Sequence, residues 1–154
     1  MQKNNNQKTG KIIKILLIIG MIISIPIMGI IPFLLKHSIS LIHAILIIYP
    51  NGILMLVIIW EFIKLFKSLE MNNPFNHNNV KILKNTGTIS FIMSSIWFID
   101  LLDLLLVIKN YYINYIIVLL FLTLLFIGVG ISLYILSALF KQATDYKEEN
   151  DLTI

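Results

Sequence analysis

The feature that most constrains this chain is a series of long hydrophobic runs that are almost free of charge. Four such runs occur, at residues 15–35, 38–60, 85–108 and 110–140, and the third carries two aspartates. About 20 apolar residues in a helix cross the hydrocarbon core of a bilayer, so the runs predict four transmembrane helices. They lack the inside–outside alternation of barrel strands, which argues against a membrane β-barrel.

The overall composition also indicates a membrane protein. Of the 154 residues, 58% are hydrophobic and 13% are charged, whereas a soluble domain has roughly 25% charged residues. A soluble fold of this size has too much surface to cover with so few charges. This excludes an ordinary soluble enzyme and a free nucleic-acid-binding domain. The absence of cysteine excludes disulfide frameworks, thiolate metal sites and cysteine nucleophiles.

We expect one all-α domain over residues 1–154, a polytopic bundle of four transmembrane helices. The helices are predicted near residues 13–35, 41–67, 82–106 and 115–140. The first run exceeds the roughly 7–15 residues of a signal-peptide core, so we expect it to be retained. Residues 1–9, rich in Asn, Gln and Lys, are predicted to be disordered. Segments 68–81 and 141–154 are predicted to be a loop and a tail in water.

The distribution of lysine predicts the orientation. Ten of the 12 lysines lie before the first run, between residues 64 and 84, or in the tail, and only Lys36 and Lys109 lie in the other two connections. Lysine concentrates on the cytoplasmic side of membrane proteins, so both termini and the 68–81 loop are predicted to be cytoplasmic. The chain is then a multi-pass protein of the cell membrane.

Two local patterns bear on helix shape and packing. Residues 49–52, Tyr-Pro-Asn-Gly, are the strongest helix-breaking signal within a hydrophobic run. They indicate either a bend in the second helix or the boundary between a surface segment and the helix proper. Small residues spaced by four predict close packing between helices. They are Thr86, Ser90 and Ser94, together with Gly20 and Ser24, and Gly128 and Ser132.

The 68–81 loop contains a helix-start signal. Asn76 is a good N-cap, and Phe75 and Val80 then have the spacing of a hydrophobic staple. One interpretation is that the segment only sets the angle between the second and third helices. The other is a docking loop for a cytoplasmic partner, with Phe75 as its apolar anchor. The candidate partner-binding residues are Asn73, Pro74, Phe75 and Asn79.

The C-terminal tail combines acidic and apolar residues. Four carboxylates fall within residues 145–151, and the chain then ends Leu152-Thr153-Ile154. Such a run is either a solvated, fraying terminus or an acidic tail with an apolar hook that binds a basic partner. In the second case the candidate residues are Glu148, Glu149, Asp151, Leu152, Thr153 and Ile154.

Asp100 and Asp103 are costly in a membrane helix, and intramembrane carboxylates are normally functional candidates. Three interpretations stay open. Both carboxylates contact headgroup water at the outer interface, or they form a proton-sensitive or cation-binding cluster with a histidine, or they pair with a lysine. The histidines concerned are His43 and His37, and the lysines are Lys36 and Lys109.

The sequence lacks the patterns of catalytic sites. It has no glycine-rich phosphate loop, no zinc-protease motif and no serine nucleophile elbow. Its three histidines lie at unrelated depths and do not form a metal-ligand set. We therefore expect no enzyme, no catalytic residue, no cofactor and no metal.

Two segments carry recognisable motifs. They are Ser68-Leu69-Glu70, Asn73-Pro74-Phe75, Asn79-Val80-Lys81 and Leu83-Lys84, followed by Tyr-Lys-Glu-Glu-Asn-Asp-Leu-Thr-Ile at residues 146–154. On these motifs the chain resembles domain-of-unknown-function family 2975. The resemblance implies a small four-helix bacterial membrane protein, often encoded beside a short helix-turn-helix regulator. It implies no particular biochemical activity.

The leading functional hypothesis is a regulatory or sensing protein that holds a soluble partner, such as a small helix-turn-helix regulator, at the bilayer. DNA-binding modules are basic and the tail carboxylates are complementary to them, so the chain itself is not expected to bind nucleic acid. One alternative is a small transporter or pore subunit, which needs a homo-oligomer because four helices leave little room for a pathway. The other is an immunity or envelope-protection protein.

Overall fold

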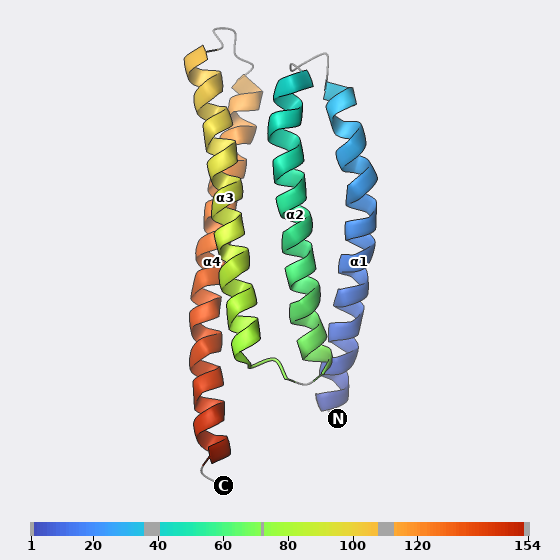
Figure 1. Ribbon diagram of the computed structural model, residues 1–154, viewed down its shortest axis with the longest axis vertical. Coiled ribbons are helices and arrows are strands. Elements are labelled where there is room, and N and C mark those ends of the chain that lie inside the picture. The colour runs from blue at the N-terminus through green and yellow to red at the C-terminus, as the bar shows by residue number, and fades with distance from the viewer. Residues whose placement is uncertain (1, 36–40, 72, 108–112, 153–154) are drawn as a thin grey trace.

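A computed structural model describes residues 2–35, 41–71, 73–107 and 113–152. The described chain is all-α, as predicted. Its helices are α1 (Gln2–Leu35), α2 (Leu41–Glu70), α3 (His77–Val107) and α4 (Ile113–Leu152). Each of the four is long and apolar enough to cross a membrane. Both chain termini and the α2–α3 connection lie at one end of the molecule, which we call the loop end (Figure 1).

The four-helix bundle is built from two antiparallel hairpins that lie side by side (Figure 1). α1 packs against α2, α3 packs against α4, and the hairpins meet where α2 contacts α3. Within the described ranges, the α1 backbone does not closely approach α3 or α4. One hydrophobic cluster joins side chains of α2, α3 and α4, namely Leu65, Ile82, Leu83 and Leu133. Each of the four helices leaves large apolar side chains exposed toward lipid.

A repeat of seven residues organises the contact between α3 and α4. The buried residues of α4 include Thr123, Gly130, Ser137 and Thr144, which are seven residues apart. A seven-residue repeat keeps one side of a helix facing its partner along its whole length. Because these residues are small, the two backbones approach closely, as is usual in membrane helix pairs.

The opposing face of α3 is also rich in small polar residues. Thr86, Ser90 and Ser94 are all buried, which confirms their predicted role in packing. The Ser94 hydroxyl donates to the Thr123 carbonyl at 3.0 Å, and the Ser137 hydroxyl donates to the Val80 carbonyl at 3.0 Å. The seam between α3 and α4 is therefore bonded across its length as well as packed.

The other two predicted small-residue positions were wrong. A Cβ atom added to Gly20 or to Gly128 would meet nothing within 4 Å. The close approaches occur at Gly87 and Gly130 instead, where an added Cβ would lie 2.7 Å from Tyr134 Cδ2 and 3.0 Å from Phe91 Cε1, respectively. Spacing by four residues identifies a helix face, but it does not say which face meets another helix.

α1 begins at Gln2, whereas the sequence predicted a disordered arm over residues 1–9. Gly10 is the point of closest approach described near the start of α1. A Cβ there would lie 3.2 Å from the Phe66 carbonyl oxygen and 3.2 Å from the Glu70 amide nitrogen, so α1 rests directly on the α2 backbone. The Lys14 ammonium also forms an ion pair with the Glu70 carboxylate. These contacts support the polar first turns of α1 outside the predicted span.

α2 is continuous through Pro50, so residues 49–52 do not divide a surface segment from the helix proper. Pro50 removes one backbone donor from the helix. The adjacent Asn51 amide donates to the Ile47 carbonyl at 2.9 Å, which adds a side-chain bond at the same turn. Gly52 faces α1, because a Cβ there would collide with the Met28 side chain. This local polarity is therefore accommodated within one helix.

Candidate functional site

The α2–α3 connection is fixed by the side chains of its own asparagines. The backbone N–H of Asn79 donates to Asn76 Oδ1 at 2.9 Å, which confirms Asn76 as the N-cap of α3. Asn76 Nδ2 in turn donates to the Asn73 carbonyl at 2.6 Å. The Asn73 N–H donates back to the Ser68 carbonyl at 3.0 Å, which closes the end of α2. The connection is therefore a structured turn.

Asn79, a predicted partner-binding residue, is buried inside this turn. Its side-chain nitrogen, Nδ2, donates to the Pro74 carbonyl at 2.7 Å and to the Ser68 hydroxyl. These bonds tie the start of α3 to the end of α2. Asn79 therefore stabilises the connection from inside and is not part of its exposed surface.

Phe75 lies on the surface of the connection and contacts α4. Its side chain is 41% exposed, and its ring packs against that of Phe140 with the centroids 5.3 Å apart. The predicted staple between Phe75 and Val80 stays a prediction. The contact with Phe140 shows that Phe75 is held by the α3–α4 hairpin while half of its ring is open.

α4 continues as a helix through the acidic tail and contacts the α2–α3 connection. Lys147 Nζ donates to Asn73 Oδ1 at 3.0 Å, and His77 Nε2 lies 3.1 Å from Glu148 Oε1. Residues 113–152 thus form one helix, which near its end contacts Asn73 of the connection and His77 at the start of α3. Of the predicted apolar hook, Leu152 is exposed at the end of α4, whereas Thr153 and Ile154 lie outside the described residues.

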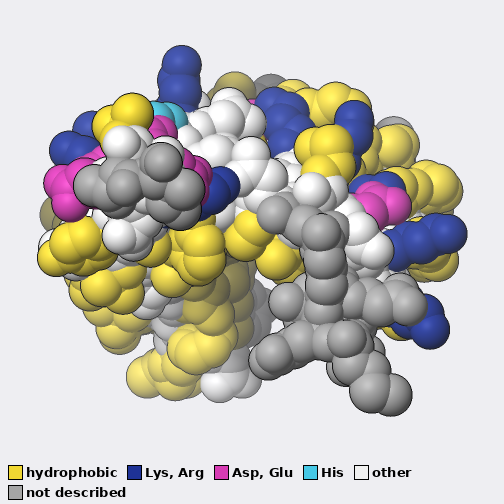
Figure 2. Space-filling model, turned by 90° about the horizontal axis from the view of Figure 1, so that it is seen from below, with side chains coloured by type: hydrophobic (Ala, Val, Ile, Leu, Met, Phe, Trp, Pro, Cys, Tyr) yellow, Lys and Arg dark blue, Asp and Glu magenta, His cyan; other side chains and the backbone are white. Residues whose placement is uncertain are grey.

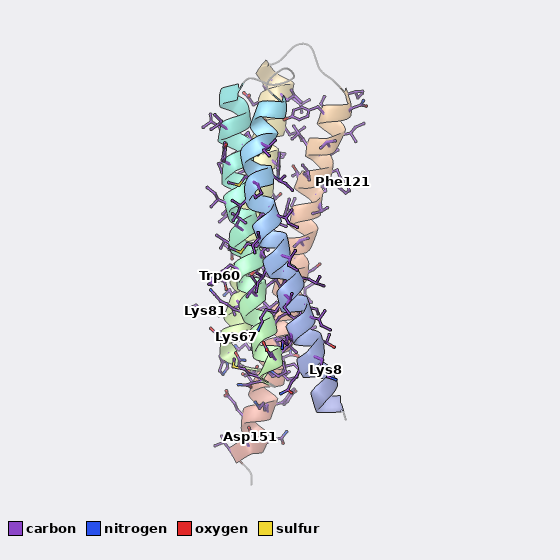
Figure 3. All side chains as sticks on the ribbon, turned by 90° about the vertical axis from the view of Figure 1, so that its right-hand side faces the viewer. Lys8, Trp60, Lys67, Lys81, Phe121 and Asp151 are labelled. Carbon is purple, nitrogen blue, oxygen red and sulfur yellow. The ribbon has the colours of Figure 1, made fainter. Side chains whose placement is uncertain are left out.

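The end of α4 carries a local excess of negative charge. Asp145, Glu148, Glu149 and Asp151, which we call the acidic end, are offset in the last turns by Lys141 and Lys147. In Figure 2, which views the loop end, most of the acidic side chains lie over α4 and many of the lysines lie over α1 and α2. Figure 3 shows Asp151 well beyond Lys8 and Lys67 along the long axis. The acidic end therefore projects from the rest of the molecule.

Asp100 lies at the opposite end, between α3 and α4. It is 1% exposed, so the interpretation that it contacts headgroup water is wrong for this residue. The Tyr115 hydroxyl donates to Asp100 Oδ2 at 3.2 Å. Asp103, one turn further on, is half-buried. The buried carboxylate is thus part of the α3–α4 seam.

The proposed partners of Asp100 and Asp103 cannot be placed beside them. His43 belongs to α2, but its side chain is outside the described structure. His37, Lys36 and Lys109 lie outside the described residues altogether. The histidine and lysine pairings therefore stay predictions. Over the described ranges, no three His, Cys, Asp or Glu side chains lie close enough together to hold a metal ion.

Sequence reasoning missed three residues that organise these regions. They are Tyr115, His77 and Lys147, which respectively contact Asp100, Glu148 and Asn73. The sequence signal for these contacts was the expected antiparallel pairing of α3 with α4. In such a pair, residues at equal distances from the α3–α4 connection lie beside each other.

Four spanning helices in two hairpins define this chain as a four-helix membrane protein. A family model described as "Protein of unknown function (DUF2975)" matches residues 7–154. The chain therefore belongs to the DUF2975 family, in agreement with the resemblance of its loop and tail motifs. No match was found to a curated protein or to a solved structure.

Proposed function

We propose that this membrane protein has both termini and the α2–α3 connection in the cytoplasm. Ten of the 12 lysines belong to segments at the loop end, and lysine is retained on the cytoplasmic side during insertion. Reporter fusions after Glu70 and at the C-terminus should then behave as cytoplasmic, and one after Lys109 as external. An external signal from the fusion after Glu70 would overturn this orientation.

We further propose a regulatory or sensing role, in which the acidic end and Phe75 hold a soluble basic partner at the membrane. The observation that carries this proposal is the length of α4. Its 40 residues extend about 60 Å, roughly twice the thickness of the hydrocarbon core. The surplus ends in exposed carboxylates, which a membrane anchor does not need.

A small helix-turn-helix regulator fits this surface in charge and in context. Nucleic-acid-binding modules carry a basic face, which is complementary to Glu148, Glu149 and Asp151. The gene neighbourhood implied by the family resemblance points to the same class of partner. Binding the regulator through its basic face would compete with DNA, so membrane capture would lower the free regulator concentration. The protein would act by binding, without catalysis, cofactor or metal.

The test is co-purification from membranes of a small helix-turn-helix regulator with a basic surface. Full-length protein should recover it, and Glu148→Gln/Glu149→Gln/Asp151→Asn should recover much less. Recovery should also fall as salt is added, since exposed charges are screened over about 8 Å at physiological ionic strength. Lys81→Gln/Lys84→Gln, which alters charge on α3, should not reduce recovery. Equal recovery by the full-length and acidic-end variants at all salt concentrations would exclude the acidic end.

Removal of residues 152–154 tests the apolar part of the same surface. No described span depends on these residues, so insertion and the α3–α4 contact should be unchanged. Recovery of the regulator should fall because the exposed Leu152 side chain is lost. Unchanged recovery would limit the docking surface to the acidic end and Phe75.

A second candidate, an oligomeric transporter or pore subunit, is favoured by one observation. Asp100 is a fully buried carboxylate within a membrane-spanning helix, and such groups mark ion or proton pathways. Vesicles containing the purified protein would then show an ion or proton flux that Asp100→Asn abolishes. A flux that is equal in both proteins, or absent from both, would remove this candidate.

A further inference from the structure

A second charged surface at the loop end is formed by α1 and α2. Lys11, Lys14 and Lys67 all lie within electrostatic reach of the Glu70 carboxylate. Lys14 is paired with Glu70 and is largely covered, whereas Lys11 and Lys67 are exposed. Lys14 therefore contacts the Glu70 carboxylate directly, and the charges of the two exposed lysines act on it from further away. We call Lys11 and Lys67 the basic pair.

The two lysines come from different helices and are brought together by the contact at Gly10. Lys11 follows Gly10, which rests on the backbone of Phe66 and Glu70, and Lys67 follows Phe66. The basic pair is therefore level on the two helices. Lys8, one turn before Lys11, adds a further exposed lysine, and Figure 3 shows Lys8 and Lys67 near the same end of the α1–α2 hairpin.

Directly beyond the basic pair, the surface becomes apolar. On α1 the next turns expose Ile12, Ile15 and Leu16, and none of the most hydrophobic window of this helix is buried. On α2 the exposed Trp60 ring lies two turns from Lys67, and Lys64 Nζ is 5.9 Å from its centroid. Tryptophan favours the level of the lipid headgroups. The basic pair is thus placed at the membrane interface, next to exposed aliphatic side chains.

We propose that the basic pair binds the phosphodiester headgroup of an anionic phospholipid, whose acyl chains lie along the exposed aliphatic surface of α1. The two ammonium groups attract the single negative charge of the phosphodiester, and the apolar turns can contact the acyl chains attached to it. Juxtamembrane lysines are attracted to anionic lipid in this way. The proposal does not depend on the regulator or on the side of the membrane that the loop end faces.

The basic pair differs from the other lysines at this end. Lys81 and Lys84 are also exposed, and Figure 3 places Lys81 at about the level of Lys67. They belong to α3, whose first turn lies beside Glu148 of α4. The acidic end therefore opposes the positive potential near Lys81 and Lys84, whereas the α1–α2 hairpin carries no comparable acidic run. This difference supplies a matched control with the same change in net charge.

The experiment is native mass spectrometry of the full chain in detergent, with phosphatidylglycerol or phosphatidylcholine added. The unchanged protein should retain phosphatidylglycerol in preference to phosphatidylcholine. Each lysine near an anionic surface strengthens binding by about fivefold, so Lys11→Gln/Lys67→Gln should weaken retention by roughly 25-fold. Lys81→Gln/Lys84→Gln should retain the lipid. Lys11→Arg/Lys67→Arg should also retain it, which separates loss of charge from misfolding.

Three results would overturn the proposal. The first is equal retention of the two lipids by the unchanged protein. The second is an equal loss of phosphatidylglycerol in the two glutamine variants, which would mean that only net charge matters. The third is a change in oligomeric mass with unchanged lipid content in Lys11→Gln/Lys67→Gln. In that case the basic pair binds the acidic end of a second copy.

Discussion

The α3–α4 hairpin and the α1–α2 hairpin contain helices of similar length, yet different contacts hold them together. Across the α3–α4 seam, small residues recur every seven positions and hydroxyl groups bond to backbone carbonyls of the facing helix. Between α1 and α2, the helices approach closely at Gly10 and Gly52, and Lys14 forms an ion pair with Glu70. Hydroxyl-to-carbonyl hydrogen bonds therefore join α3 to α4, whereas close glycine contacts and an ion pair join α1 to α2.

This difference matters more in lipid than it would in water. Acyl chains are as apolar as leucine, so hydrophobic burial does not drive membrane helices together and packing and hydrogen bonds do. The exposed isoleucines of α1 therefore contribute little to its position. We infer that the α3–α4 hairpin is the stable frame that carries the acidic end, and that α1 is the more easily displaced helix.

The largest effect is expected from a bulky residue in the α3–α4 seam. In Gly87→Val, the new side chain would meet the Tyr134 ring and the Gly130 carbonyl oxygen, which lies only 3.2 Å from an added Cβ. The backbones must then separate, at a cost of about 2–3 kcal/mol. A thermal melt in detergent should show this loss. Gly128→Val, where a Cβ meets nothing within 4 Å, is the control and should melt like the unchanged protein. Similar melting temperatures for the two variants would contradict the close approach of α3 and α4 at Gly87.

The next largest effect is expected from Tyr115→Phe. This change removes the hydroxyl that donates to the buried Asp100 and leaves an acceptor less well satisfied. The expected cost is about 1–2 kcal/mol in the same melt. Tyr146→Phe, at a largely exposed position, is the matched control. If both substitutions are silent, Asp100 does not depend on Tyr115.

A smaller effect is expected where the two hairpins join. Asn76→Ala removes the side-chain acceptor for the Asn79 N–H at the start of α3, which costs about 1 kcal/mol. Asn78→Ala, two residues further on at an exposed position, is the control. A fall in melting temperature confined to Asn76→Ala would support the cap. An equal fall in the melting temperature of both variants would mean that the loss of any asparagine near this helix end is destabilising, and would contradict the cap.

The smallest effect is expected from Lys14→Gln on the α1–α2 side. The Lys14–Glu70 pair lies near the surface, where ion pairs contribute little and salt screens them. The melting temperature should fall slightly at low salt and be unchanged at high salt. A loss as large as that of Gly87→Val would show that the two hairpins are equally dependent on single contacts, against the comparison drawn above.

Features with local causes were predictable from the sequence. The four helices follow from charge-free runs long enough to span a membrane, and the cap at Asn76 follows from a polar side chain just before a helix. The start of α1 was not predictable in this way. The close contact of Gly10 with α2 depends on the arrangement of the two helices, which the sequence of α1 does not contain.

The packing face of α4 could have been predicted, but a spacing of four led to the wrong face. Gly128 and Ser132 are exposed, whereas the longer repeat of Thr123, Gly130 and Ser137 faces α3. In the candidate site, the acidic end was identified from its charges. Its contacts through His77 and Lys147 were not, because they join residues more than 70 positions apart.

The central claim is that the acidic end is an ordered part of α4, held on the α2–α3 connection, and not a fraying terminus. The chain has no cysteine, so spin labels can be placed at Asn78→Cys and Leu152→Cys in lipid and their separation measured by pulsed electron paramagnetic resonance. Asn78→Cys with Lys141→Cys is the reference pair. The account predicts a single narrow distance distribution for both pairs. A broad distribution for Leu152 beside a narrow one for Lys141 would contradict it.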